Sequence, residues 1–160
     1  FLEKHVQMHS NDIPSAMLLA ERQIGKDRAA AIKTYEQVLA KTPDNFVVLN
    51  NLAFLALEDK KLTRAEELAK KAVSLQRENA DAADTLAQIY IAKGDKAAAL
   101  KLYEEVAARP IANDDVYLNY VSVLLELDKK ALASRKLASR EFKSEAAKQR
   151  AESLKQQYGL

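Results

Sequence analysis

The residues best suited to chemistry in this chain are two histidines near its start. His5 and His9 lie four residues apart, a spacing that in a helix directs both imidazoles to one side and gives half of a metal site. The residues between them, Val6, Gln7 and Met8, do not complete the HExxH pattern of zinc hydrolases. The 160 residues include no cysteine, no glycine-rich phosphate loop and no GxSxG nucleophile motif. We therefore predict no catalytic residue, no metal site, no cofactor and no small-molecule substrate.

The composition predicts a chain that is nearly all helix. Three glycines and three prolines leave little for loops, while Ala, Leu, Lys, Glu and Gln are strong helix formers. No apolar run approaches the roughly 18–20 residues that a membrane span requires. The formal net charge is only +2, which by itself favours no class of partner.

A single repeat period organises these helices. Alanine recurs every 34 residues, and other apolar positions keep the same spacing. The alanines are Ala31, Ala65, Ala99 and Ala133. Thirteen residues before them stand Leu18, Leu52, Leu86 and Tyr120, and four residues after them stand Tyr35, Ala69, Tyr103 and Leu137. A helical hairpin of this length cannot bury its own apolar face, so it must stack on a neighbour.

This pattern resembles the tetratricopeptide-repeat (TPR) family. The resemblance implies an all-α, right-handed solenoid of antiparallel helix hairpins, a TPR superhelix, with a C-terminal capping helix. We expect one TPR domain over residues 1–160. Its parts are a remnant of a preceding repeat at 1–11, repeats at 12–45, 46–79 and 80–113, a divergent repeat at 114–147, and the capping helix at 144–160. Arg140 stands where the family carries a small apolar residue, so the second helix of the divergent repeat is expected to be short or bent.

The resemblance also implies a binding site. In this family the first helix of each hairpin lines a concave groove that binds peptides. The groove residues carried over to this chain are Val47, Asn50, Asn51, Phe54, Asp81, Asp84, Thr85, Gln88, Asp115, Asn119 and Ser122. Asn51 and Asn119 can each give and take a hydrogen bond, which suits an extended peptide backbone, and Phe54 offers an apolar anchor.

The expected ligand is a neutral or basic protein segment rather than a C-terminal carboxylate. Chaperone-binding TPR modules grip a carboxylate with lysine, arginine and asparagine side chains. Here Asn51 matches one of them, but Ala16, Ala20, Asp81 and Thr85 stand at other places of that clamp. Acidic side chains would repel a carboxylate.

Short stretches resemble one group of bacterial TPR proteins more closely. Residues 43–55, 82–87 and 142–157 are similar to the TPR lipoprotein associated with the PEP-CTERM/exosortase sorting system. This resemblance implies a periplasmic or envelope-associated scaffold in an assembly or export machine. A generic bacterial TPR protein, which could be cytoplasmic, would carry similar stretches, so the localisation stays open.

The leading hypothesis is a non-enzymatic scaffold that binds a protein segment in the groove. A second is a purely architectural piece of a longer solenoid. A third is nucleic-acid binding through the basic cap, because residues 128–160 hold nine Lys and Arg against four Asp and Glu. A solvated helix face explains these charges better than a binding surface does. The sequence names neither the ligand nor the oligomeric state.

Overall fold

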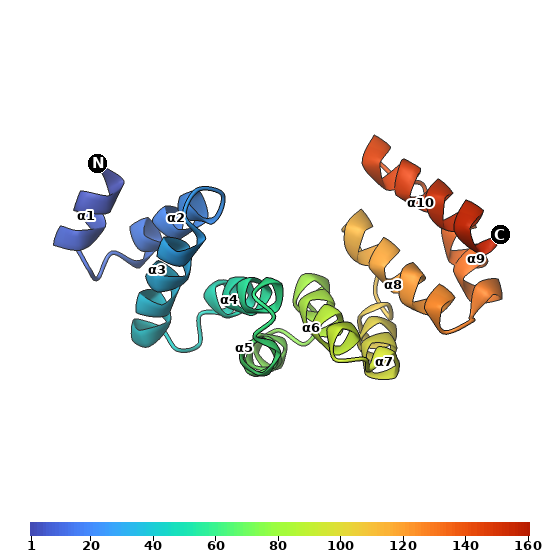
Figure 1. The fold of residues 1–160 in the computed structure, drawn as a ribbon, viewed down its shortest axis with the longest axis horizontal. Coiled ribbons are helices and arrows are strands. Elements are labelled where there is room, and N and C mark those ends of the chain that lie inside the picture. The colour runs from blue at the N-terminus through green and yellow to red at the C-terminus, as the bar shows by residue number, and fades with distance from the viewer. The chain divides into compact units, whose positions relative to one another are not determined.

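The computed structural model describes residues 1–160. In it the chain forms ten α-helices and no β-strand (Figure 1). The helices are α1 (Leu2–Met8), α2 (Ile13–Ile24), α3 (Arg28–Lys41), α4 (Phe46–Glu58), α5 (Leu62–Leu75), α6 (Ala80–Ala92), α7 (Lys96–Val106), α8 (Asp114–Glu126), α9 (Lys130–Ala138) and α10 (Glu145–Tyr158). The all-α class predicted from the sequence is confirmed. No helix combines the length and the apolar character that crossing a membrane requires.

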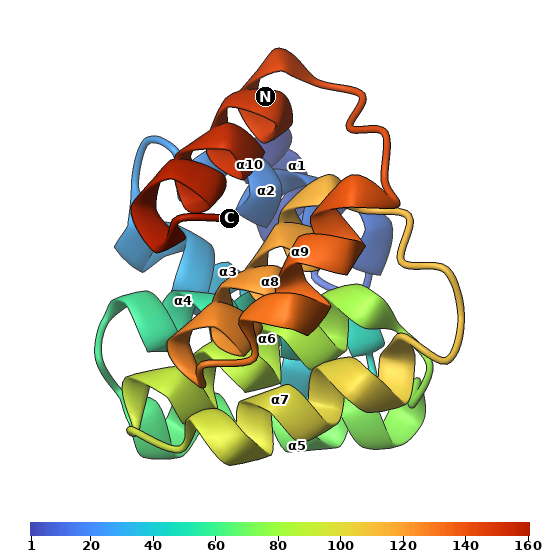
Figure 2. The same cartoon turned by 90° about the vertical axis from the view of Figure 1, so that its right-hand side faces the viewer.

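The chain forms two compact units, residues 1–76 and residues 77–160. In the first unit α2 pairs with α3 and α4 with α5, and α1 packs on α2. In the second unit α6 pairs with α7 and α8 with α9, and α10 packs on α8 and α9 (Figure 2). Within each unit the hairpins also contact each other, α3 against α4 and α7 against α8. Each unit is therefore built from stacked helical hairpins.

The periodic alanines are fully buried. Ala31, Ala65, Ala99 and Ala133 are each 0% exposed. A side chain no larger than a methyl group lets two helices approach closely, and a larger one would have to push them apart at about 1–3 kcal/mol. The burial of all four confirms that the repeat period marks the packing positions of the hairpins.

Asparagine caps fix where the first helix of three hairpins begins. Asn45, Asn79 and Asn113 keep the period of the alanines and are the N-caps of α4, α6 and α8. The side-chain oxygen of each accepts a hydrogen bond from a backbone N–H of the first turn, which would otherwise lack a partner. The start of the helix then determines which later residues share a face.

The turns inside these hairpins share one left-handed residue. Lys60, Gly94 and Asp128 again keep the repeat period, and they have φ of 58°, 86° and 57°. Glycine takes this conformation freely, whereas a residue with a Cβ is strained there by about 1–2 kcal/mol. The turn geometry is therefore kept even where the sequence offers no glycine.

One apolar position of the repeat is exposed in the first hairpin although it is buried in the other three. Leu52, Leu86 and Tyr120 are each 3% exposed, but Leu18 is 44% exposed. The element on this side of α2 is α1, which is only seven residues long and leaves a cavity of about 540 Å³ between Leu18 and the start of the chain. Leu18 therefore lacks the cover that its equivalents have.

Arg140 closes the last hairpin of the second unit. Helix α9 has nine residues, against fourteen in α3 and α5. Just beyond it the Arg140 guanidinium donates to the Asp114 carboxylate at 2.6 Å and 2.9 Å, and to the carbonyl oxygens of Ile111 and Ala112. It also lies over the Tyr117 ring, 4.4 Å from the ring centre. This arginine ties the segment before α8 to the segment after α9, a role that a small apolar residue could not perform.

Candidate functional site

Four residues of α4 form one surface of the first unit, which we call the α4 face: Val47, Asn50, Asn51 and Phe54. Their spacing of three, four and seven residues places them on one side of the helix. Val47 is 41% exposed and Phe54 48% exposed, so two apolar side chains face the solvent at either end. The two asparagines lie between them and are half-buried.

Asn51 is held in place by a buried tyrosine. Its Nδ2 donates to the Tyr35 hydroxyl at 3.0 Å, which links α4 to α3. Tyr35 is 0% exposed, and burial raises the pKa of its hydroxyl, which therefore stays protonated at neutral pH. The Asn51 carbonyl oxygen has no partner within the protein. Asn51 thus keeps an acceptor and one amide hydrogen while its orientation is fixed.

Asn50 carries a second acceptor without a donor. Its Oδ1 is buried and makes no hydrogen bond. A buried polar atom left without a partner costs about 1–3 kcal/mol, and such atoms are rare in folded proteins. The α4 face therefore has one amide oxygen, that of Asn51, that a donor from outside the chain could satisfy, because the Asn50 oxygen is closed to solvent.

The second unit carries a denser polar network. The Tyr103 hydroxyl donates to Asp84 Oδ1 at 2.5 Å and accepts from Gln88 Nε2 at 3.1 Å. Asn119 Nδ2 donates to both Asp84 oxygens, at 2.9 Å and 3.1 Å. Burial raises the pKa of the Asp84 carboxyl, while the hydrogen bonds from Tyr103, Asn119 and Gln88 oppose that rise. The network joins α6, α7 and α8 around one desolvated carboxyl group.

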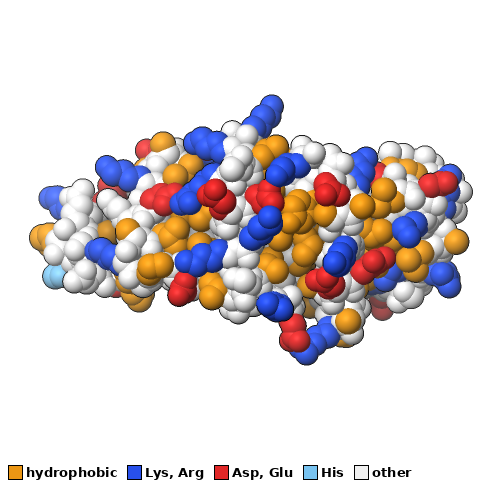
Figure 3. All heavy atoms as spheres, turned by 90° about the horizontal axis from the view of Figure 1, so that it is seen from below, with side chains coloured by type: hydrophobic (Ala, Val, Ile, Leu, Met, Phe, Trp, Pro, Cys, Tyr) orange, Lys and Arg blue, Asp and Glu red, His pale blue; other side chains and the backbone are white.

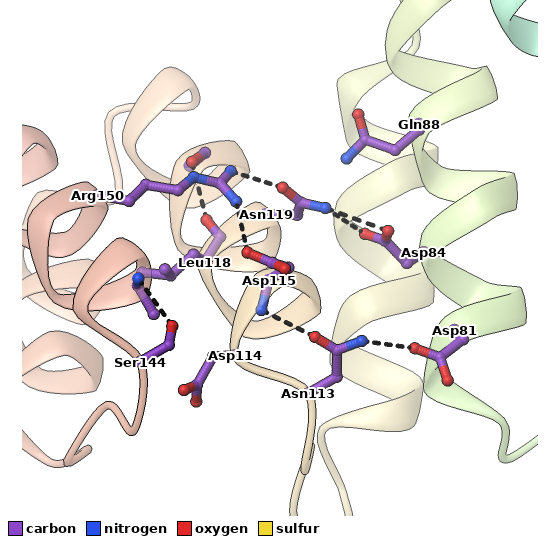
Figure 4. Close-up of polar contacts among 12 residues, drawn as sticks. Asp81, Asp84, Gln88, Asn113, Asp114, Asp115, Leu118, Asn119, Ser144 and Arg150 are labelled. Carbon is purple, nitrogen blue, oxygen red and sulfur yellow. Dashed lines mark hydrogen bonds and ion pairs between the residues drawn. The ribbon is translucent and has the colours of Figure 1, made fainter. Parts of the chain in front are cut away.

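The capping helix α10 reaches the same network. Figure 4 shows Arg150 extending from α10 toward Asn119, and its Nη2 donates to Asn119 Oδ1 at 2.6 Å. Its Nη1 lies 3.8 Å from the Asp115 carboxylate. On the other side of Asp115, Asn113 bridges to Asp81 through a 3.0 Å hydrogen bond. The amide of Asn119 is therefore engaged on both its donor and its acceptor side.

The remaining two predicted groove residues bond only within their own helices. The Thr85 hydroxyl donates to the carbonyl oxygen of Asp81 at 3.1 Å, and the Ser122 hydroxyl to that of Leu118 at 2.8 Å. Thr85 is 8% exposed and offers little surface for contact. Of the eleven predicted groove residues, Val47, Asn50, Asn51 and Phe54 lie in the first unit. The other seven lie in the second, where Asp84, Gln88 and Asn119 share the Tyr103 network.

The tyrosines that position these groups were assigned by sequence only to packing. Tyr35 stands before Asn51 at the same interval as Tyr103 stands before Asn119. The two pairs are separated by two repeat periods. This repeated spacing is the signal that could have revealed Tyr35 as the partner of Asn51 and Tyr103 as a member of the network that contains Asn119. Arg150 gives no comparable signal.

One of the two histidines near the start, His5, is hydrogen-bonded to Asp12. His5 Nε2 lies 2.9 Å from Asp12 Oδ2, and the His5 and His9 rings have their centres 4.6 Å apart and are tilted by 39°. The hydrogen bonds from His5 and then Ser15 lower the pKa of the Asp12 carboxyl to about 2. No group of three or more His, Cys, Asp or Glu side chains is arranged to hold a metal ion.

Comparison with known families identifies the repeats. Two profiles described as tetratricopeptide repeat match residues 24–89 and residues 79–109, which together cover more than half of the chain. The chain belongs to the tetratricopeptide-repeat family. Comparison with curated proteins gives no match. The TPR fold supports a protein-interaction scaffold in general, and proteins of this family are generally non-enzymatic.

Solved structures of other TPR proteins share the fold. The crystal structure of MamA has a TM-score of 0.72 at 14% identity and covers 98% of this chain and 88% of its own. PilF of Pseudomonas aeruginosa has a TM-score of 0.75 at 19% identity, and the match covers 99% of this chain and 82% of PilF. YrrB, described as a TPR protein with an unusual peptide-binding site, has a TM-score of 0.69 at 13% identity. The match covers 86% of this chain and 71% of YrrB. At these identities the likeness concerns the fold alone.

Proposed function

We propose that this TPR chain is a non-enzymatic scaffold that binds an extended segment of a partner protein on the α4 face. The observation that carries the proposal is the state of Asn51. Tyr35 fixes its side chain, yet its carbonyl oxygen and one amide hydrogen remain available. A peptide unit presents one N–H and one C=O, so a single asparagine can pair with both.

The flanking residues supply the apolar part of the contact. Val47 and Phe54 are exposed at either end of the asparagine pair. Seven helical residues span about 10 Å, close to the length of three residues of an extended chain. A segment that bonds to Asn51 can therefore also place side chains on Phe54 and Val47, and burial of an aromatic anchor is a common source of affinity.

The chemistry of the α4 face favours a neutral or basic segment. It offers the Asn51 amide oxygen, which has no donor within the protein, and it has no Lys or Arg side chain. A carboxylate would bring further acceptors to a face without a cation, whereas a backbone N–H group or a basic side chain would satisfy the Asn51 oxygen. The peptide-binding site named in the description of YrrB lends the proposal support by analogy of fold. The resemblance of residues 43–55 and 82–87 to bacterial envelope proteins supports a place in an export-related assembly.

Selection of peptides from a random dodecamer display library on the full chain tests this function. Recovered peptides are measured by fluorescence polarisation against the wild type and the Asn51→Ala/Phe54→Ala double variant. We expect the double variant to lose at least about tenfold in affinity, the effect of removing about 1.4 kcal/mol of contact. Leu75→Ala is the matched control, because Leu75 is an equally exposed apolar residue of the same unit, at 42%.

Two outcomes would contradict the proposal. Peptides that bind the double variant as tightly as the wild type would place their site elsewhere. Recovery of no peptide would favour the architectural alternative, in which these repeats only extend a longer solenoid. Phe54→Ala alone guards against misfolding, because Phe54 lies in solvent and its loss leaves the Asn51 to Tyr35 bond intact.

The basic end of the chain does not favour nucleic-acid binding. Lys148 pairs with Glu145 at 2.7 Å and Lys155 with Glu152 at 2.6 Å, and Arg140 is bound to Asp114. Figure 3, seen from below Figure 1, draws a different face from that of α10, and there too basic and acidic side chains alternate over the surface. Phosphate binding needs cations that release counterions, and paired cations contribute less of this effect.

A further inference from the structure

Helix α10 is attached to the second unit by a small apolar contact. Only Ala147 and Ala151 of its fourteen residues are buried, and Leu154 and Tyr158 are partly buried. By comparison α4 and α6 each bury six residues. An element with few buried apolar groups opens at a lower free energy than the core helices do. The structure therefore allows α10 to leave α8 while the hairpins stay folded.

Arg150 is the polar part of that attachment. Its guanidinium donates to Asn119 Oδ1 at 2.6 Å and lies 3.8 Å from the Asp115 carboxylate. Its side chain is 39% exposed, so water already reaches it. Two nitrogens of one planar guanidinium thus address an amide oxygen and a carboxylate from a single side chain, an arrangement that a lysine ammonium does not reproduce.

The comparison between Asn51 and Asn119 shows what Arg150 changes. The two asparagines are separated by two repeat periods and follow equivalent tyrosines, Tyr35 and Tyr103. The Asn51 oxygen has no donor, whereas the Asn119 oxygen is occupied by Arg150. An equivalent position on the repeat is thus open in the first unit and closed in the second by a side chain from α10.

The charge around Asn119 fits a cation in that place. Asp84 accepts the Asn119 amide on one side, and Asp115 faces Arg150 on the other. Asp114 is already neutralised by Arg140. Removal of Arg150 would leave the Asn119 oxygen and Asp115 without a guanidinium, and a guanidinium from outside the chain would restore the same contacts.

Resting on the proposed peptide-binding function, we propose that Asn119 is a second binding position, which takes an arginine side chain of the partner and which Arg150 occupies until the partner displaces it. The α10 helix then acts as an internal competitor. Its departure exposes the α8 surface at the same time as it frees Asn119. A partner with an arginine is favoured over one with a lysine or an acidic residue.

Titration of the full chain with Nα-acetyl-arginine amide tests this inference, with the side-chain amide signals of Asn119 followed by NMR. We expect Arg150→Ala to bind this probe about three- to tenfold more tightly than the wild type, because one competing hydrogen bond to an amide oxygen has been removed. Nα-acetyl-citrulline amide, which has the same shape without the charge, should not shift the signals. Asn119→Ala combined with Arg150→Ala should bind no better than the wild type, as judged from backbone signals of α8.

Lys148→Ala is the matched control, because it removes the same charge from the same helix, and Lys148 pairs only with Glu145. An equal gain in Lys148→Ala would reduce the effect to net charge and overturn the inference. Unchanged affinity in Arg150→Ala, or no shift at Asn119 in any variant, would overturn it as well. Arg150→Gln repeats the test with a residue of high helix propensity, in case the alanine variant perturbs α10. Because the signals belong to Asn119, a negative result leaves the Asn51 and Phe54 experiment to decide the proposed function separately.

Discussion

Replacement of Tyr103 by phenylalanine isolates the hydrogen bonds around the buried Asp84 carboxyl. The ring is 0% exposed and remains filled by Phe, so the packing is preserved. What is lost is the donor to Asp84 at 2.5 Å and the acceptor for Gln88 at 3.1 Å. Tyr35→Phe is the matched control, because it removes a hydroxyl at the equivalent position of the first unit that bonds only the neutral Asn51.

The expected costs differ because the partners differ in charge. A hydrogen bond to an ionised group contributes about 1.5–3 kcal/mol, against about 0.5–1.5 kcal/mol for a neutral pair. At about pH 7 we therefore expect Tyr103→Phe to destabilise its unit by about 1–2 kcal/mol more than Tyr35→Phe destabilises the other, provided that Asp84 is ionised there.

The pH dependence follows from the direction of the Asp84 shift. Burial raises the pKa of Asp84 above its usual 3.8, and the bond from Tyr103 lowers it, so the variant has the higher Asp84 pKa of the two proteins. Below both values the carboxyl is protonated in both proteins, and the extra cost of Tyr103→Phe is small. It grows as the pH rises through the Asp84 pKa, because the charged form then lacks its donor.

Native-state hydrogen exchange gives the free energy of opening for each unit separately, from amides of α3 and α4 and from amides of α6 to α8. Equal costs for the two variants at about pH 7, or a Tyr103→Phe cost that does not change down to about pH 4, would refute the assignment of Asp84 as an ionised group held by this hydroxyl.

Four further changes have expected outcomes. Ala99→Leu should destabilise the second unit by about 1–3 kcal/mol in urea unfolding, because the new side chain has no room beside its hairpin partner. Lys60→Gly should stabilise the first unit by about 0.5–1 kcal/mol, measured in the same way, because strain at φ of 58° is relieved. Arg140→Lys should cost about 1–2 kcal/mol and lower the melting temperature, because an ammonium keeps the charge but loses the bonds to two carbonyl oxygens. The pKa of Asp12 is lowered to about 2, with the bond from His5 as the main cause, so its contribution to stability is complete above the usual 3.8 and is lost as the pH falls through about 2. Asp12→Asn should remove this loss of stability at low pH, measured as the pH dependence of urea unfolding. If the variant loses stability at low pH as the wild type does, the prediction is wrong.

The sequence predicted the hairpins because their determinants are local and periodic. Ala99 and its equivalents mark close helix contacts at a step of 34 residues, which can be counted along the chain. Asn79 and its equivalents keep the same step, but only the structure identified them as helix starts. Leu18 shows the limit of such counting. It has the residue type of its column, but its exposure depends on how much of a neighbouring element covers it.

The candidate site was predicted only in part, for a related reason. The period places Asn51 and Asn119 on equivalent faces, and so it located the residues. It did not reveal their partners, because Tyr35, Asp84 and Arg150 reach them through side-chain directions and distances between helices.

The chain by itself therefore determined the TPR fold and the positions at which its helices pack closely, since these follow from residue types repeated along one dimension. Only the tertiary structure decided which equivalent positions are open. Asn51 and Asn119 are the same residue at the same place in the repeat, yet one amide oxygen is free and the other is bound by Arg150. The hydrogen-bonding state of a side chain depends on what the fold brings within about 3 Å of it.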